Sequence, residues 1–245
     1  MAENNVHPSA VIDAAAVLGT AVTVGPCAVI EAEAHVGSNT IIEAHAYIGH
    51  DVIIGEGCCI GVGAVLRDGV VLDNGVRLGA GVVLGTDGFG YVFDGSTHLK
   101  IPQVGGVHIG ANTIVEADTC IDRATTGTTE VGANSHVGPM VMIGHNCKVG
   151  DGCQIGYQVG FAGSSTMGND CVMAPQSGMA MRAELGDGSR VEFRAAVLRK
   201  LPAGSHVAGF PARPVEEARR IEAAIHRLPK VLEALDASAS PVEAS

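Results

Sequence analysis

Residues 36–66 read VGSNTIIEAHAYIGHDVIIGEGCCIGVGAVL, with a large aliphatic residue at every sixth position. The spacing continues in both directions without a polar interruption, through Val6, Ile12, Leu18, Val24, Ile30, Val36, Ile42, Ile48, Ile54, Ile60, Leu66, Leu72, Leu78 and Leu84. A period of six fits neither an α-helix of 3.6 residues per turn nor an alternating strand. It predicts an all-β solenoid in which each hexad is one short strand and a turn, and three hexads make one coil.

The residues between the large aliphatics predict how each coil closes. Four positions after each aliphatic, a small or β-branched side chain recurs, as at Ala28, Thr40 and Ala46. We expect the large side chains to fill a triangular prism, the small ones to fill its corners, and glycine to serve sharp turns. The period does not specify handedness, and the general crossover preference favours a right-handed coil.

Two insertions interrupt the repeat. The first, residues 85–108, reads GTDGFGYVFDGSTHLKIPQVGGVH and carries three aromatic residues, Phe89, Tyr91 and Phe93. It is too long for a corner, so it is predicted to project from the prism as a functional loop. The second lies near Arg123–Glu130, where the hexad step lengthens to ten residues.

The hexads are predicted to form one domain over 6–208, followed by a helical extension at 209–236. In this extension apolar residues recur at spacings of 4, 3, 4 and 3, at Ile221, Ile225, Leu228, Leu232 and Leu235. Pro229 predicts two helices, one over about 215–228 and a short one that begins at the proline. The apolar stripe predicts a surface that packs on neighbouring subunits. Residues 237–245 are predicted to be a disordered tail.

Composition excludes several classes of protein. The net charge of -11 argues against a nucleic-acid binder. There is no apolar run long enough to be a transmembrane segment and no secretory leader, which predicts a cytoplasmic protein. The seven cysteines include no CxxC pair, so we expect reduced thiols and no metal site. Cys147, Cys153 and Cys171 lie at multiples of six from one another and are expected to be small wall residues that face the core.

Several motifs resemble the UDP-3-O-acylglucosamine N-acyltransferase (LpxD) family of hexapeptide-repeat acyltransferases. They are TDGFGY at 86–91, KIPQVGGVHIGANT at 100–113, IDR at 121–123, IGHN at 143–146, QVGFAGSSTMG at 158–168 and GFPARP at 209–214. The resemblance implies a left-handed parallel β-helix and a homotrimer with active sites between subunits. It also implies transfer of a 3-hydroxyacyl chain from acyl carrier protein to a glucosamine amine in lipid A biosynthesis.

The sequence departs from this family in three places. The family carries an N-terminal uridine-binding domain, whereas this sequence starts directly in the hexads. Gly138-Pro139 stands where the family usually has an Asp-Asn pair, and Met181-Arg182 where it commonly has Gly-His. The expected acceptor is therefore a UDP-sugar or a sugar-lipid, and the residue that orients the base is open.

N-acylation needs a base for the attacking amine and donors for the thioester oxyanion. His145 follows an inward hexad residue and a glycine, so it is predicted to point outward at a corner as the general base. Gly163 lies one coil further along the chain and is expected to stack on His145. The resemblance implies that the backbone N–H of this glycine binds the oxyanion.

Further residues are candidates for substrate binding. Met140, Met142 and Met181 are off the inward positions and could line an acyl groove, since flexible thioethers suit a polymethylene chain. Arg182 could bind a phosphate. Phe89 and Tyr91 on the projecting loop could contact the acceptor sugar or the next subunit. Asn146 and Gln158 are included because they lie within the family motifs.

Cations concentrate at the C-terminal end, where residues 181–245 hold ten of the fifteen Lys and Arg. They could steer an acidic acyl carrier protein. Arg199, Lys200 and Arg213 are the candidate donor-binding residues, and Arg199 matches a family position that contacts the pantetheine arm. No bound cofactor is expected, because the acyl-phosphopantetheine on acyl carrier protein is itself the donor.

Two other functions stay open from the sequence. One keeps the fold but uses coenzyme A to acylate another sugar. The other is a non-catalytic β-helix that binds a partner, suggested by the altered pairs at 138–139 and 181–182. A carbonic-anhydrase-like metal site is disfavoured, because His136 and His145 lie nine residues apart, half a coil rather than a whole one.

Overall fold

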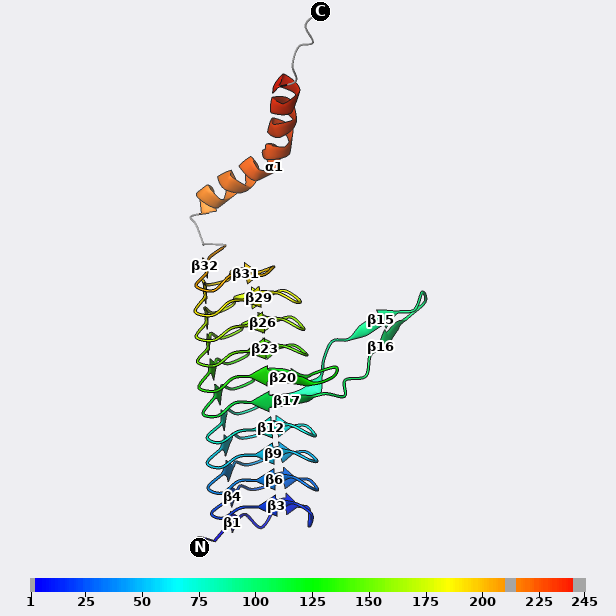
Figure 1. Cartoon of the computed structure of the whole chain (residues 1–245), viewed down its shortest axis with the longest axis vertical. Coiled ribbons are helices and arrows are strands. Elements are labelled where there is room, and N and C mark those ends of the chain that lie inside the picture. The colour runs from blue at the N-terminus through cyan, green and yellow to red at the C-terminus, as the bar shows by residue number, and fades with distance from the viewer. Residues whose placement is uncertain (1–2, 210–214, 240–245) are drawn as a thin grey trace, which may run out of the picture. The chain divides into compact units, whose positions relative to one another are not determined.

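The computed structural model describes residues 3–209 and 215–239. The chain divides into two compact units, Met1–Gly209 and Phe210–Ser245. The first unit is a left-handed parallel β-helix, whose stacked coils form the prism in Figure 1. No helix among the described residues is long and apolar enough to cross a membrane.

Three parallel sheets form the faces of the prism. Sheet A contains β1 (Asn5–Val6), β4 (Thr23–Val24), β7 (Ile41–Ile42), β10 (Cys59–Ile60), β13 (Arg77–Leu78), β18 (Ile114–Val115), β21 (His136–Val137), β24 (Gln154–Ile155), β27 (Val172–Met173), β30 (Arg190–Val191) and β32 (His206–Val207). Sheet B contains β2 (Val11–Ile12), β5 (Val29–Ile30), β8 (Tyr47–Ile48), β11 (Val65–Leu66), β14 (Val83–Asp87), β19 (Cys120–Arg123), β22 (Met142–Ile143), β25 (Gly160–Phe161), β28 (Gly178–Met179) and β31 (Ala196–Val197). Sheet C contains β3 (Val17–Leu18), β6 (His35–Val36), β9 (Ile53–Ile54), β12 (Val71–Leu72), β17 (Gly106–Ile109), β20 (Thr128–Val131), β23 (Lys148–Val149), β26 (Thr166–Met167) and β29 (Glu184–Leu185).

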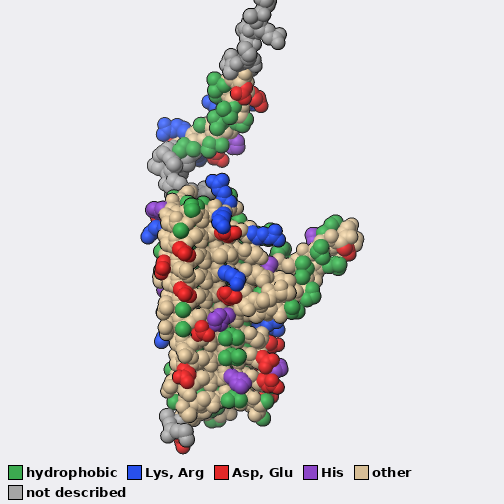
Figure 2. All heavy atoms as spheres, viewed as in Figure 1, with side chains coloured by type: hydrophobic (Ala, Val, Ile, Leu, Met, Phe, Trp, Pro, Cys, Tyr) green, Lys and Arg blue, Asp and Glu red, His purple; other side chains and the backbone are tan. Residues whose placement is uncertain are grey.

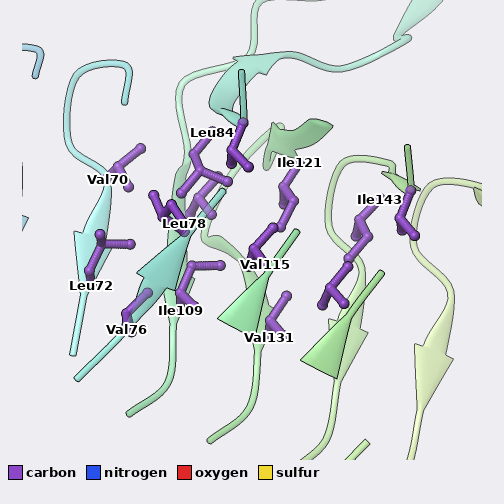
Figure 3. Close-up of a cluster of buried hydrophobic side chains, with 14 of the residues drawn as sticks. Val70, Leu72, Val76, Leu78, Leu84, Ile109, Val115, Ile121, Val131 and Ile143 are labelled. Carbon is purple, nitrogen blue, oxygen red and sulfur yellow. The ribbon is translucent and has the colours of Figure 1, made fainter. Parts of the chain in front are cut away.

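The register explains why the hexad pattern forms one continuous core. Residues eighteen apart pair on neighbouring coils, as Ile60 does with Leu78. The second residue of a typical strand points inward, and Figure 3 shows a section of these buried aliphatic side chains. Cys147, Cys153 and Cys171 are fully buried at the corners, which confirms that these cysteines are small wall residues of the core.

The preference for a right-handed coil was wrong. That preference describes long crossovers, usually helices, that span a twisted sheet. Here most strands are two residues long and tight corners join them. Many corners use a residue in the left-handed αL region, such as Asn39 and Asn146, with φ of 60° and 59°. The crossover preference therefore does not apply to these short connections, and the family resemblance gave the correct left-handed sense.

Both insertions leave the prism at the corner between sheets B and C. The first forms the antiparallel hairpin of β15 (Tyr91–Phe93) and β16 (His98–Lys100), which projects from the prism in Figure 1. The second forms an extended turn between β19 and β20. The two insertions meet there, since the backbone N–H of Val104 donates to the carbonyl of Thr125 at 3.1 Å.

The second unit contains one helix, α1 (Val215–Ala239). The predicted break at Pro229 was wrong, because Pro229 lies inside this helix. A proline removes one backbone hydrogen bond and usually bends a helix without ending it, and the ribbon of α1 bends partway along in Figure 1. The helix also extends three residues into the segment predicted to be a tail; 240–245 lie outside the described residues.

Candidate active site

One corner column brings together several of the predicted residues. The corner between sheets B and C carries His145, Gly163, Met181 and Arg199 at intervals of eighteen residues. The backbone N–H of Ser164 donates to the carbonyl of His145 at 2.8 Å, and that of Arg182 donates to Gly163 at 3.3 Å. We call this column, with the residue that follows each member, the His145 corner.

Two glycines hold the His145 side chain. A Cβ added at Gly88 would lie 2.5 Å from the Cβ of His145, and one added at Gly163 would lie 2.5 Å from its Nε2. Real Cβ atoms do not approach other atoms so closely, so a larger residue at either position would displace the His145 side chain. The long insertion therefore covers one side of the histidine, and the next coil lies against its Nε2.

The Asn146 side chain orients the imidazole. Its Oδ1 accepts from the backbone N–H of Thr125 at 2.9 Å and its Nδ2 donates to the carbonyl of Thr126 at 2.8 Å, which fixes the amide orientation. The same Oδ1 lies 3.1 Å from Nδ1 of His145. Because an amide oxygen only accepts, Nδ1 carries the proton in the neutral ring and Nε2 has the free lone pair.

Polar contacts tie the two insertions to His145. The Thr125 hydroxyl donates to Oε1 of Gln103 at 3.0 Å and lies 3.4 Å from Nδ1 of His145. The Gln103 amide is 6% exposed and donates to the carbonyl of Ile101 at 3.1 Å. Sequence reasoning did not select Gly88, Gln103 or Thr125. The resembling motifs at 86–91 and 100–113 contain the first two, and only the fold brings them to His145.

The Gly163 backbone N–H is free for a ligand. At other corners a side chain one coil further along accepts the matching N–H, as Oδ1 of Asn169 does from Asp151 at 2.9 Å. One coil beyond Gly163 the residue is Met181, whose side chain has no oxygen to accept this hydrogen bond. Among residues 3–209 and 215–239 the Gly163 N–H has no acceptor. A free donor next to an unprotonated imidazole nitrogen can bind a developing oxyanion while the imidazole removes a proton.

A buried carboxylate lies beside this pair. Asp122 is 4% exposed and pairs along the strand with Thr86 of β14. Its pKa is raised to about 6, mainly by burial; His145 opposes this shift, and the charge of Asp87 adds to it. Asp87 itself forms an ion pair with Lys100, which lowers the pKa of Asp87. Asp122 belongs to the IDR motif, but the sequence alone did not mark it as a site residue.

Other candidate residues lie away from the His145 corner. Met140 and Gln158 lie at the corner between sheets A and B, where Gln176 donates to Gln158 at 2.9 Å. Met142 points out of sheet B between the two corners and is 40% exposed. Tyr91 begins the projecting hairpin, and its ring lies 5.2 Å from that of Phe89.

The cationic candidates lie on the last coils. Arg182, Arg199 and Lys200 are exposed, and the Lys200 ammonium pairs with Glu184 at 2.6 Å. Figure 2 shows Lys and Arg side chains gathered at this end of the prism on the visible face. Arg213 lies outside the described residues.

A separate groove of about 600 Å³ lies on sheet A. Its lining includes Pro139, Tyr157, His136 and Arg190. The size suits a small molecule, but its ionisable groups are already paired, His136 with Glu116 at 3.0 Å and Arg190 with Glu192 at 3.1 Å. The chemistry of general base and free donor is found at the His145 corner.

Known proteins resemble this chain in its repeats and in part of its sequence. The profile of the bacterial transferase hexapeptide (six repeats) matches residues 33–68 and 128–163. The UDP-3-O-acylglucosamine N-acyltransferase of Campylobacter curvus is 37% identical over 145 residues, which are 58% of this chain and 46% of that protein. UDP-3-O-acylglucosamine N-acyltransferase 1 of Gloeobacter violaceus is 40% identical over 150 residues, 61% of this chain and 43% of that protein. The chain thus spans less than half the length of these curated relatives.

Solved structures extend the likeness in fold. The Arabidopsis UDP-N-acetylglucosamine acyltransferase superposes with a TM-score of 0.76 at 22% identity, covering 98% of this chain and 86% of that one. At this identity the match shows a shared architecture. It supports the left-handed β-helix and not a particular substrate.

Proposed function

The chain belongs to the UDP-3-O-acylglucosamine N-acyltransferase family of hexapeptide-repeat proteins, and from this premise we propose that it is an N-acyltransferase. The proposed reaction moves a 3-hydroxyacyl chain from acyl carrier protein to the glucosamine amine of a UDP-3-O-acylglucosamine-like acceptor. Such an enzyme would act in lipid A biosynthesis in the cytoplasm.

One observation carries the proposal: the free Nε2 lone pair of His145 lies against Gly163, whose N–H has no acceptor among the described residues. A lone outward histidine would be an ordinary surface residue. Here two glycines and the Asn146 amide hold the ring in one orientation, and such preorganisation is what general-base catalysis requires.

The chemistry follows from these two groups. The acceptor amine attacks the thioester carbonyl carbon, forms the new C–N bond and gives a proton to Nε2 of His145. The Gly163 N–H stabilises the negative charge that develops on the carbonyl oxygen. The C–S bond then breaks, and the protonated imidazole returns its proton to the departing thiolate. The products are an amide and the free thiol of the carrier.

The surroundings suit both substrates. Above Gly163 the corner continues with Met181, which is 66% exposed, and then with Arg199. We propose that Met181 and Met142 contact the acyl chain, and that Arg182, Arg199 and Lys200 bind the phosphopantetheine arm and the acidic carrier. Phe89 follows the glycine that covers His145 and is 85% exposed, so it is available to the acceptor sugar.

A homotrimer is part of the proposal, and the outer face of sheet B supports it. The first residue of every strand in this sheet points outward and is uncharged: Val11, Val29, Tyr47, Val65, Val83, Cys120, Met142, Gly160, Gly178 and Ala196. The corresponding columns of sheets A and C include Arg77 and Glu130. An uncharged column along a whole face is suited to burial against other copies of the chain.

The test is a turnover assay with a 3-hydroxyacyl carrier-protein donor. UDP-3-O-acylglucosamine and a nucleotide-free acylglucosamine are offered in parallel as acceptors, and acyl coenzyme A replaces the carrier in a second series. We expect N-acylated product from the carrier donor and none from His145→Ala. Product from the acyl coenzyme A donor alone would show that the protein is a coenzyme A-dependent acyltransferase instead. No product from any pair would reject the activity.

A further inference from the structure

Asp122 is a buried carboxylate without a partner. The residue is 4% exposed, yet its side chain forms no hydrogen bond or ion pair with the residues in 3–209 or 215–239, and its oxygens keep slight contact with solvent. Burying an unpaired charge costs folding free energy, and such costs are usually kept where a function needs them. The reaction proposed above assigns Asp122 no role.

The backbone register locates Asp122 on the coil below, beside the residue that precedes the base. Ile121 of β19 pairs with Ile143 of β22, so Asp122 lies level with Gly144 on the adjacent coil. Neighbouring strands are about 5 Å apart. His145 is the next residue along the chain, and the two side chains interact electrostatically.

Other cations near Asp122 are engaged elsewhere. Arg123 donates to the carbonyls of Gly85 and Asp68, at 2.9 and 2.6 Å, and Lys100 pairs with Asp87. Since these groups are held, the imidazole of His145 is the group beside Asp122 that can become positive during the reaction.

We propose that Asp122 is a positioning residue, which stabilises the protonated form of His145 during acyl transfer without touching the substrate. This inference rests on the proposed function and adds to it. Asn146 fixes the tautomer of the neutral ring, whereas Asp122 supplies the negative charge that the protonated ring needs. A carboxylate kept free of other partners is available for that step.

The remaining titratable groups around the pair do not replace Asp122. Burial raises the pKa of the Cys120 thiol to about 11, and the pKa of Cys147 is also raised, so both thiols stay neutral near pH 7. Arg67 interacts with Asp87 from the corner below, and Asp87 is paired. Asp122 is therefore the unpaired anion that faces His145.

The test compares Asp122→Asn with Asp170→Asn, which removes an exposed carboxylate at the corner between sheets C and A. We expect Asp122→Asn to lower kcat about 10-fold with KM unchanged, as for loss of one charge interaction across a few ångströms. In the wild type, we expect kcat to fall more steeply as pH drops through about 6, because Asp122 becomes protonated in that range and loses its charge. This steeper component is lost in Asp122→Asn and kept in Asp170→Asn.

Asp122→Ser serves as a second neutral variant, and thermal unfolding shows that each variant is folded. If both neutral variants kept the wild-type rate and profile, the inference would be overturned while the acyltransferase assignment stood. If the wild type itself gave no transfer, the proposed function would fail first, and the two results are distinguishable.

Discussion

Two corners of the prism carry almost the same tetrapeptide. Residues 48–51 read IGHD and residues 143–146 read IGHN, and both lie at the corner between sheets B and C. Their histidines nevertheless have different surroundings. His50 has a side chain that is 51% exposed and lies 3.6 Å from Asp51, whereas His145 is half-buried between two glycines.

The difference comes from residues one coil away. Beside His50 that coil presents Asp68, whose Oδ1 accepts from the His50 backbone N–H at 3.2 Å. Beside His145 it presents Gly163, which has no side chain to accept a hydrogen bond from the His145 backbone. Of the two corners, only the one at His145, which we call the upper corner, is covered by the long insertion, through Gly88. The corner at His50 is the lower corner. The tetrapeptide therefore places a histidine at a corner, and the residues around that histidine determine whether it can act as a base.

The largest effect is expected from the histidines themselves. His145→Ala should lower kcat at least 100-fold, since a general base usually contributes a factor of 10² to 10⁴. His50→Ala, the matched change in the lower corner, should stay within about twofold of the wild type. Steady-state turnover of both variants measures this. Equal losses would mean that the tetrapeptide, and not its surroundings, determines activity.

The next effect concerns Gly163→Ala. Its φ is not positive, so the backbone tolerates alanine and the added Cβ acts only against the His145 ring. Alanine keeps the backbone N–H but displaces the ring, and we expect kcat to fall about 100-fold, as for a misplacement of the base by about 1 Å. The stability cost should disappear when His145 is also alanine, because the clash is gone. Thermal unfolding of the single and double variants checks this, and an undiminished cost in the double variant would contradict the packing.

Asn146→Gly removes the oxygen that orients Nδ1 and keeps a residue that accepts positive φ. We expect kcat to fall about 10-fold, because the neutral ring then exchanges between tautomers. Asp51→Gly makes the same change in the lower corner, where φ is 56°, and should leave turnover unchanged. An Asn146→Gly enzyme with the wild-type rate would show that another group orients the base.

The smallest effect is on stability. The folded-state pKa of Asp122 is raised from 3.8 to about 6, so the folded protein loses stability as pH rises from about 4 to 6. A neutral amide is cheaper to bury than an unpaired carboxylate. The free energy of unfolding of Asp122→Asn should therefore exceed that of the wild type by about 1–3 kcal/mol at pH 7.5. This gain in stability should shrink near pH 4. Unfolding followed by circular dichroism at both values measures it; equal gains would exclude the raised pKa.

The sequence predicted the prism well, because one inward residue in six determines which hexads stack. It predicted that His145 would lie at a corner by the same periodicity. It did not identify Gly88, Gln103, Thr125 or Asp122 as site residues. The first three belong to the insertions, where no period relates chain position to space.

Local rules also failed where geometry overrode them. The crossover preference assumes long connections, and these corners are short and use αL residues such as Asn146. Proline often ends a helix, yet α1 continues through Pro229. Asn146 stays a predicted substrate contact, and its hydrogen bonds to His145, Thr125 and Thr126 add a role that its motif did not predict.

The corner at His145 fixes a histidine whose Nε2 carries no proton, and the corner at His50 does not. Nitrogen-15 NMR of the imidazoles at pH 8 tests this directly, since the two ring nitrogens of a neutral histidine differ in shift according to which one carries the proton. We expect a single Nδ1–H tautomer for His145 and a solvent-like mixture of tautomers for His50. The single tautomer of His145 should be lost in Asn146→Gly. An Nε2–H tautomer at His145, or the same mixture at both histidines, would contradict it.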